Sequence, residues 1–559
     1  MKRNFTLVRL KVLLVLTIIP ALSFSQNINS GSIQGNFQMD AQYYKKDSAI
    51  GAQNVPQKIL MNAFCNLIYT NGNFSAGIRY ESYRDPMLGF DTRYKGSGIG
   101  SRYASYKVDD FEVTVGNFYE QFGNGLILRS YEERNLGLDN AMDGIKIRVN
   151  PYKGIVLKGL IGMQRYFWDL GSGIVRGGDA EFNLNEIIKS FSENKTHITF
   201  GGSVVSTYEA TQDILYDATQ KYVLPENVAS FAGRLNVSRG KISFMSEYAY
   251  KANNPNATNG FIYKPGEALL VSATYSQKGL GIILSAKRID NMAFKSSRTE
   301  VGNMLNLNYL PALTRQHTYS LSSIYPYATQ PNGEMGCQGE VTYTLPKGSV
   351  LGGAYGAEIK ANYSLAKSLD KQQINDTTAI GQGGTLGYTS NFFKFGNEMY
   401  FQDFNIEVTK KLSKSIKALV SWVNLTYNKA VIEGHPGAPI VYSNIFIADV
   451  TYKISPKKSL RGELQHLATK QDQGNWAQAL LEYSIAPKWF FTVTDMYNYG
   501  NSDDSKKIHY YNFCVAFNKG ANRIQLSYGK QREGILCVGG VCRLVPAADG
   551  INISITSSF

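Results

Sequence analysis

Apolar and polar residues alternate along most of this chain, beginning with SIQGNFQMDAQYY at residues 32–44. A period of two predicts a β-strand, because successive side chains of a strand point to opposite faces. Here the apolar face carries Ile33, Gly35, Phe37, Met39, Ala41 and Tyr43, and the polar face carries Gln34, Asn36, Gln38, Asp40 and Gln42. Five polar side chains on one face indicate that this face meets water. The pattern recurs at residues 74–81 and 111–115.

The connections between the predicted strands fall into two classes. Short hairpin turns are expected at 70–73, 108–110, 238–241, 276–279, 345–348, 411–415, 454–459, 485–488 and 518–522. Longer loops rich in Gly, Asn, Asp and Ser are expected at 209–227, 252–266, 365–394 and 429–439. An aromatic residue often precedes a short turn by a few positions. Short turns on one rim, long loops on the other and aromatics near the short rim are typical of an outer-membrane β-barrel.

The expected fold is therefore all-β, a single large antiparallel transmembrane barrel of about 22–26 strands. The range reflects residues 116–142, 164–200 and 291–317, where the alternation lapses. The 37 Tyr and 28 Phe suit a barrel wall anchored by aromatic belts. No run of 18 apolar residues follows the first 25, which excludes helical membrane spans. The alternative, a soluble protein of packed sheets, would need several domains joined by linkers, and no linker is visible.

The first 25 residues are predicted to be a secretory signal peptide. A basic start precedes the short apolar run VLLVLTIIPAL, and small residues precede Gln26. We expect residues 26–559 to form the barrel, with both termini periplasmic and without a separate plug domain, because the first strand begins by about residue 32. The formal net charge of +14 falls to +10 when the four basic residues of the first 25 are removed. For an exported chain this charge favours lipid headgroups, anionic solutes or an acidic partner over nucleic acid, and plain surface charge is a further explanation.

The chain ends in INISITSSF, residues 551–559, which alternates up to its last residue. A closed barrel has to pair its last strand with its first, so that no unpaired edge remains in lipid. We therefore expect Ile551, Ile553 and Ile555 to face lipid and Phe559 to lie in the periplasmic aromatic belt. The ending also resembles the C-terminal signal by which barrel assembly machinery recognises outer-membrane barrels.

Two cysteines, Cys537 and Cys542, flank the sequence Val-Gly-Gly-Val. If Gly539 and Gly540 form a primed two-residue turn, the cysteines face each other in a pair whose Cα atoms lie about 4.5 Å apart. This spacing allows a disulfide, which an exported protein can form. Cys65, Cys337 and Cys514 lie in separate predicted strands and are expected to be free.

A charged cluster lies within one of the poorly alternating stretches, at Arg129, Glu132, Glu133, Arg134 and Asp139. It has two interpretations, a constriction folded into the lumen, where fixed charges select solutes, or a solvated loop. The five histidines have no metal-ligand spacing and form no catalytic unit, so we expect no metal site, no cofactor and no enzymatic activity. The short turns also carry a ring of Lys and Arg, for which lipid headgroups, a periplasmic partner or simple solubility are open explanations.

Three stretches resemble a group of uncharacterised outer-membrane barrels typical of the Bacteroidetes, and the resemblance runs the whole mature length. They are GNFYEQFGNGLILRSYEERNLGLDNAMDGIKIRV at 116–149, LNYLPALTRQHTYSLSSIYPYATQPNGEMG at 305–336 and YGKQREGILCVGGVCRLVPAADGINISITSSF at 528–559. The resemblance implies a barrel in the outer membrane but no settled activity, so it assigns no functional residues.

Two functions fit these features. The first is a porin-like diffusion channel for polar solutes, because a barrel this wide cannot be filled by its own wall side chains. The second is a barrel subunit of an outer-membrane assembly or secretion complex, in which the basic rim and long loops dock an outer-membrane or periplasmic partner. An outer-membrane enzyme is disfavoured, since no polar catalytic constellation is visible.

Overall fold

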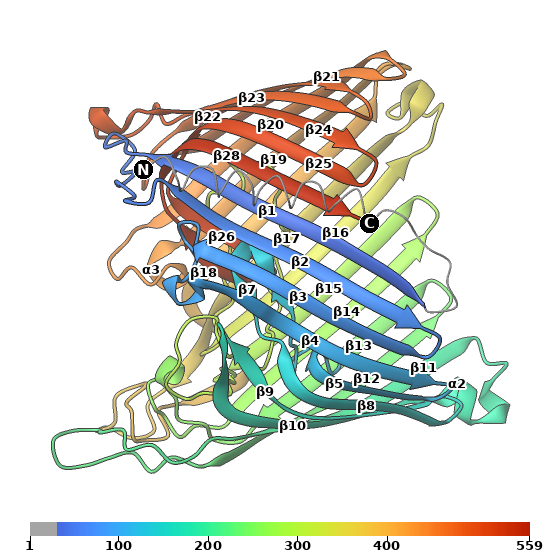
Figure 1. The fold of residues 1–559 in the computed structure, drawn as a ribbon, viewed down its shortest axis with the longest axis vertical. Helices are drawn as coiled ribbons and strands as arrows, with labels where there is room; N and C mark the ends of the chain where they lie inside the picture. Colours follow the sequence, from blue (N-terminus) through green and yellow to red (C-terminus); the bar gives the residue numbers. More distant parts are fainter. Residues whose placement is uncertain (1–30) are drawn as a thin grey trace, which may run out of the picture.

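The computed structural model describes residues 31–559; the predicted signal peptide lies outside these residues. It is an antiparallel sheet of 24 strands that closes on itself, as Figure 1 shows. The barrel strands are β1 (Ser32–Lys45), β2 (Ile59–Asn71), β3 (Phe74–Asp85), β4 (Gly96–Val108), β5 (Phe111–Phe118), β8 (Met142–Tyr152), β9 (Ile155–Tyr166), β10 (Asp169–Asn183), β11 (Thr196–Tyr208), β12 (Asn227–Arg239), β13 (Ile242–Lys251), β14 (Gly266–Gln277), β15 (Leu280–Asp290), β16 (Glu334–Leu345), β17 (Ala357–Gln372), β18 (Thr389–Lys411), β19 (Ile416–Asn428), β20 (Ile440–Ser455), β21 (Lys458–Thr469), β22 (Trp476–Ile485), β23 (Trp489–Tyr497), β24 (His509–Lys519), β25 (Asn522–Gln531) and β28 (Ala548–Ser558).

Four short strands and a few short helices lie outside the barrel sheet. The strands are β6 (Glu132–Glu133), β7 (Leu138–Asp139), β26 (Gly534–Val538) and β27 (Val541–Val545). The helices are α2 (Leu184–Ile187), α3 (Lys429–Ile432) and the 3-10 turns η1 (Thr92–Tyr94), η2 (Arg134–Leu136), η3 (Lys189–Phe191), η4 (Ala257–Asn259), η5 (Gly353–Tyr355) and η6 (Asp504–Lys506). Among the described residues, no helix is long and apolar enough to cross a membrane.

The alternation of the sequence corresponds to the two faces of the wall. Along β18 the side chains of Asp403 and Asn405 are completely buried, and they point into the barrel. The outward face carries exposed aliphatic and aromatic residues on every side, for example Ile78 at 43% exposure on β3 and Leu464 at 65% on β21. Apolar side chains outside and polar side chains inside are the arrangement that a lipid-embedded barrel requires.

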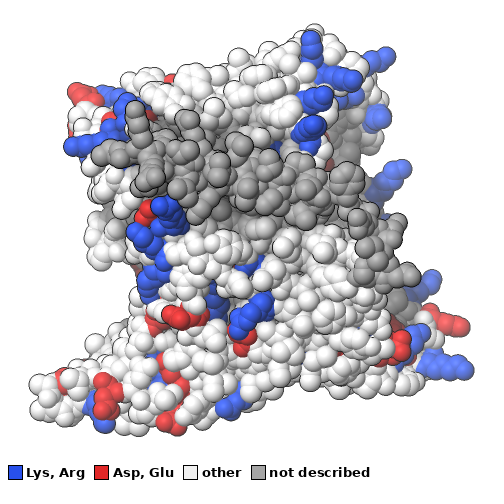
Figure 2. Space-filling view, viewed as in Figure 1, with Lys and Arg blue, Asp and Glu red and all other residues white. Residues whose placement is uncertain are grey.

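The two rims differ as the sequence predicts. All but one of the predicted short turns join adjacent strands directly, and they lie on the right side of the barrel in Figure 1. The prediction for 345–348 was wrong, because eleven residues that include η5 separate Leu345 from Ala357. The predicted loop at 365–394 is also shorter than expected, since β17 continues to Gln372 and β18 begins at Thr389. Figure 2 shows Lys and Arg side chains projecting along the right edge, at the short turns.

Three stretches of the chain fold into the barrel instead of extending its wall. We call residues 119–141 the first inner segment, residues 291–333 the second inner segment and β26–β27 the inner hairpin. Two of the poorly alternating stretches, 116–142 and 291–317, fall largely within the inner segments. The third, 164–200, contains all of β10 and belongs to the wall. Because the first two stretches do not extend the wall, the barrel has 24 strands, within the expected range of about 22–26.

The second inner segment crosses the lumen between two apolar clusters. At one side Met292, Phe294 and Leu307 pack with inward-facing residues of β9 to β15, such as Val175 and Val205. At the other side its residues Leu321, Ile324, Tyr325 and Tyr327 pack with inward-facing residues of β17 to β22. Because one segment touches the inner faces of such widely separated strands, it spans the interior of the barrel.

Candidate functional site

A buried cluster of ion pairs fastens the first inner segment to the wall. Arg79 and Glu81 come from β3, Arg165 comes from β9 and Asp139 belongs to the inner segment. Arg165 lies 2.7 Å from both Asp139 Oδ2 and Glu81 Oε2. Arg79 Nε lies 2.6 Å from Glu81 Oε1, and Arg79 also pairs with Asp139. None of these four side chains is more than 7% exposed.

The electrostatics of this cluster keep Asp139 ionised. Burial alone would raise the pKa of its carboxyl group, but the charges of Arg79 and Arg165 outweigh burial, and the net effect lowers the pKa. Two further hydrogen bonds reach Oδ1 of Asp139, from the Tyr119 hydroxyl at 2.9 Å and from the Ala141 amide at 3.1 Å. The carboxylate is therefore bonded at both of its oxygens.

The other charged residues singled out in the sequence lie in different surroundings. Glu132 lies 3.1 Å from Arg79 Nη1 and 2.9 Å from Arg134 Nε. The Arg134 guanidinium lies 4.6 Å from the centre of the Phe64 ring on β2. Glu133 instead caps η2, accepting a hydrogen bond from the Asn135 amide. Glu132, Arg134 and Asp139 are thus brought together, whereas their role as a constriction stays a prediction.

Arg129 connects the first inner segment to the second. Its guanidinium lies over two aromatic rings, 4.5 Å from the centre of Tyr131 and 4.1 Å from that of Tyr309. Asn140 adds a hydrogen bond of 2.9 Å from its side-chain nitrogen to the backbone oxygen of Asn306. The two segments therefore form one internal structure rather than two separate loops.

A row of polar residues bonds the middle of the second inner segment to the wall. Arg315 Nη2 lies 2.6 Å from Glu407 on β18, and His317 Nε2 lies 2.8 Å from Asp403 on the same strand. Beyond them, the Tyr319 hydroxyl donates to Asp449 of β20 at 3.1 Å. Alternate residues of the segment thus bond to the wall. A partner for His317 could not be recognised from the sequence, because Asp403 lies 86 residues away along the chain.

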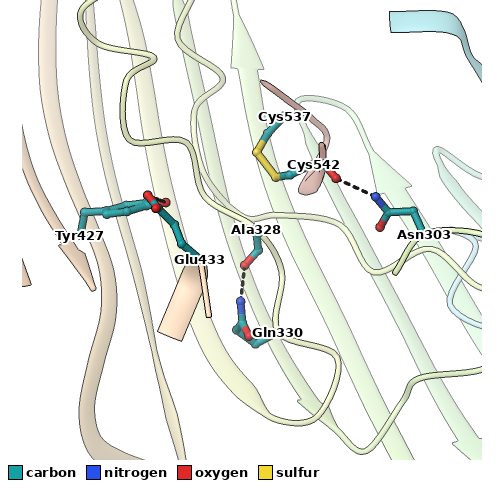
Figure 3. The surroundings of a disulfide bond; sticks show 7 residues. All are labelled: Asn303, Ala328, Gln330, Tyr427, Glu433, Cys537 and Cys542. Carbon is teal, nitrogen blue, oxygen red and sulfur yellow. Dashed lines mark hydrogen bonds between the residues drawn. A yellow bond between two sulfur atoms is a disulfide. The ribbon is translucent and has the colours of Figure 1, made fainter. Parts of the chain in front are cut away.

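The inner hairpin contains the predicted disulfide between Cys537 and Cys542, with Cα atoms 4.1 Å apart. The cysteines are direct cross-strand partners, and Gly539 and Gly540 between them both have positive φ, +59° and +88°, as a primed turn requires. Figure 3 shows the Cys542 backbone oxygen accepting a hydrogen bond from the Asn303 side chain, at 2.7 Å. The other cysteines among the described residues, Cys65, Cys337 and Cys514, are free.

The tip of the hairpin is seated on the second inner segment. The Tyr309 hydroxyl donates to Gly539 O at 2.8 Å, and the Thr329 amide donates to Gly540 O at 3.2 Å. A Cβ atom on Gly540 would come within 2.6 Å of the Thr329 hydroxyl. A side chain at this position would therefore push the tip away from the segment.

The last strand closes the barrel as the sequence predicts. β28 pairs with β1, and Met39 lies opposite Ile555. Ile551 and Ile553 are about two-fifths exposed on the outer face, and Ile555 is half-buried there. Phe559 exchanges two backbone hydrogen bonds with Gly35, at 2.9 and 3.0 Å. A Cβ on Gly35 would come within 2.5 Å of the Phe559 ring, so glycine makes room for it. Its role as an assembly signal stays a prediction.

Two cavities lie beside the hairpin tip. One, of about 130 Å³, is bounded by both inner segments, by Thr258 and by Gly540 and Val541. The other, of about 320 Å³, is bounded by residues of the second inner segment and of the hairpin, with Phe401 of the wall. Within residues 31–559, no group of three or more His, Cys, Asp or Glu side chains is arranged to hold a metal ion.

The fold is similar to those of solved bacterial outer-membrane proteins, at low sequence identity. A mutant of the ferric enterobactin receptor of Pseudomonas aeruginosa matches with 9% identity and a TM-score of 0.42, over 95% of this chain and 81% of that chain. From the same organism, the outer membrane protein opdK matches with 8% identity and a TM-score of 0.34, over 81% of this chain and 98% of that chain. OccK11 matches with 8% identity and a TM-score of 0.28, over 94% of each chain.

A search of the curated proteins finds no match. One family model, described as a family of unknown function, DUF6029, matches residues 1–559. The structural likenesses are too distant to assign a role, whereas the family match covers the entire sequence. The chain therefore belongs to the DUF6029 family.

Proposed function

We propose that this protein is an outer-membrane channel through which small polar solutes diffuse, with a fixed constriction built from the inner segments. On this proposal the short-turn rim faces the periplasm and the protein catalyses no reaction. The outward apolar face supports a membrane location, and bacterial single-chain barrels of this kind lie in the outer membrane.

The observation that carries the proposal is the attachment of the second inner segment at both sides of the lumen. Its first part is packed among β9 to β15, and its middle, residues 315–319, is bonded to β18 and β20. The segment is held by the partly buried Arg315–Glu407 pair, by hydrogen bonds from His317 and Tyr319 to the wall, and by its packing in two apolar clusters. A segment attached at so many points resists swinging aside, which favours a permanent narrow path over a displaced plug.

The charged cluster of the first inner segment would then help to select solutes. Arg134 remains 26% exposed and Glu132 remains 19% exposed, so both present charge to the lumen. Neighbouring lumen-facing residues include Lys146 and Lys158, both of which lie within 3.5 Å of Glu120. Fixed charges at a constriction favour solutes of complementary charge or of none.

The test is single-channel conductance of the purified full chain in a planar bilayer, with ion selectivity measured in a salt gradient. We expect a steady conductance. Replacing Leu536–Leu544 by a short Gly-Ser link removes the hairpin tip and is expected to raise the conductance. Silence from a correctly folded barrel would overturn the channel proposal.

A second candidate is the role of a subunit in a larger outer-membrane assembly. It is favoured by the length of β18, 23 residues, more than twice the 9–11 that span a membrane. Phe393, which lies near the beginning of β18, is 85% exposed. For this role we expect a silent barrel that co-purifies with a defined partner after mild extraction and loses that partner when Phe393 is replaced by serine.

A further inference from the structure

The smaller cavity beside the hairpin tip lies where the inner parts of the barrel meet. Its lining comes from the first inner segment, the second inner segment, the inner hairpin and the loop that contains Thr258. None of its lining residues belongs to the central part of a barrel strand. A solute that passes the proposed constriction would therefore meet this cavity within the inner structure itself.

Among the described residues, the lining contains a single charged side chain, and this side chain is already bonded to the protein. It is that of Lys295, whose amine donates to the backbone oxygens of Gly302 at 2.7 Å and Met304 at 2.8 Å. Burial also lowers the pKa of Lys295 to about 8, against a small opposing effect of Glu300. The amine is thus directed to the protein backbone, and within residues 31–559 the lining holds no carboxylate that could pair with a cationic ligand.

Several uncharged polar groups of the lining are left without a partner. The hydroxyls of Thr258 and Thr329 are buried and form no hydrogen bond with the described residues. The side-chain nitrogens of Asn303 and Asn308 donate hydrogen bonds to the backbone oxygens of Cys542 and Met292, respectively. Their side-chain oxygens remain as acceptors. A buried polar group without a partner is costly, so these groups favour an occupant that both donates and accepts hydrogen bonds.

The aromatic rings in the lining and the volume of the cavity limit which molecules can occupy it. Tyr131 and Tyr309 line the cavity, and the guanidinium of Arg129 holds both rings in place. A volume of about 130 Å³ is close to that of an engineered cavity of about 150 Å³ that holds benzene. The cavity therefore accepts roughly one six-membered ring. Small binding sites commonly combine such apolar rings with a few placed polar groups.

We infer that this cavity binds one neutral sugar ring, or a polyol of similar size, through the hydroxyls of Thr258 and Thr329 and the amide oxygens of Asn303 and Asn308. The inference deepens the proposed channel function and rests on it: the site would hold the solute within the constriction. Ordered water is the competing occupant, since water also donates and accepts hydrogen bonds.

The test is equilibrium dialysis of the folded full-length barrel in detergent against labelled D-glucose, with D-glucuronate and D-glucosamine as analogues of similar size and opposite charge. We expect saturable binding of glucose and at least tenfold weaker binding of protonated D-glucosamine, whose positive charge meets Lys295 and no carboxylate among the described lining residues. Thr329→Val keeps the shape and removes one hydroxyl, which should weaken glucose binding about fivefold, the value of one hydrogen bond. Thr199→Val, on β11 and outside the lining, should leave binding unchanged.

Three outcomes would overturn the inference: no saturable glucose binding, equal binding of the three sugars, or equal effects of Thr329→Val and Thr199→Val. Conductance of the same preparations separates this inference from the channel proposal. A conducting barrel that binds no sugar refutes the site and leaves the channel. A silent barrel that binds glucose keeps the site and refutes the channel.

Discussion

Replacing Asp139 with asparagine tests whether buried ion pairs hold the first inner segment on the wall. The substitution keeps the shape of the side chain and its acceptor oxygen for the Tyr119 hydroxyl. It removes the negative charge that lies between Arg79 and Arg165, whose side chains are 6% and 5% exposed. The new amide nitrogen would face guanidinium N–H groups, which are donors only.

The expected loss of stability follows from the geometry of the cluster. Removing one partner of a buried ion pair costs about 3–5 kcal/mol. Glu81 still contacts both arginines, at 2.6 and 2.7 Å, so we expect a loss near the lower end, about 3 kcal/mol. The matched control is Glu358→Gln, which breaks the Lys360–Glu358 pair of 3.1 Å, in which both side chains are more than a third exposed. An exposed pair contributes about 0–1 kcal/mol.

Urea-induced unfolding in lipid vesicles measures both variants, followed by the change in gel mobility between folded and unfolded barrels. The pKa of Asp139 is lowered in the folded protein. Its contribution to stability is therefore complete above the ordinary pKa of about 4 and is lost as the pH falls through the lower folded value. Asp139→Asn should lack this loss. A destabilisation of less than about 1 kcal/mol, or equal to that of Glu358→Gln, would refute the argument that the cluster anchors the segment.

Three further perturbations have definite expected outcomes. Replacing Cys537 and Cys542 by serine removes a bridge that closes a short loop, so the free energy of unfolding in urea should fall by up to about 2 kcal/mol. Current noise should rise, and unchanged noise would show that the tip stays seated without the bridge. Burial lowers the pKa of Lys295 to about 8. The free energy of unfolding of the wild type should therefore rise by about 3 kcal/mol as the pH rises from about 8 to about 10.5. Lys295→Met should show no such gain in the same urea titration. Deleting Phe559 removes two backbone hydrogen bonds to Gly35 and should lower the yield of folded barrel in vesicles, whereas a normal yield would contradict a role in closure.

The wall of the barrel was predictable because its determinants are local. A two-residue period decides which face of a strand meets lipid, and a short turn decides which strand it pairs with. The inner hairpin was predictable for the same reason, since Cys537 and Cys542 are only five residues apart. The closing pair of β1 and β28 is a long-range contact, but closure itself demands it.

The attachments of the inner segments were not predictable from the sequence. Arg79 and Asp139 are 60 residues apart, and Arg315 and Glu407 are 92 apart. No periodicity relates such partners, and each charge read alone equally fits a solvated surface. Nothing in the sequence indicates that Arg129 has a different role from Glu132 and Asp139. Its contact with Tyr309 of the other inner segment also joins residues that lie far apart along the chain.

The sequence did indicate where the barrel wall is interrupted. A connection of more than about 15 residues without regular structure is uncommon in compact proteins and usually functional. The second inner segment, 291–333, is far longer, yet Leu307 and Leu321 within it are completely buried. Apolar residues in a loop of a membrane barrel have only two destinations, the outer surface or the lumen. Polar residues that alternate with them, such as Arg315 and His317, would be costly at the lipid face. Lapsed alternation combined with interspersed Arg, His and Tyr therefore indicates an inward fold, and this criterion applies equally to the first inner segment.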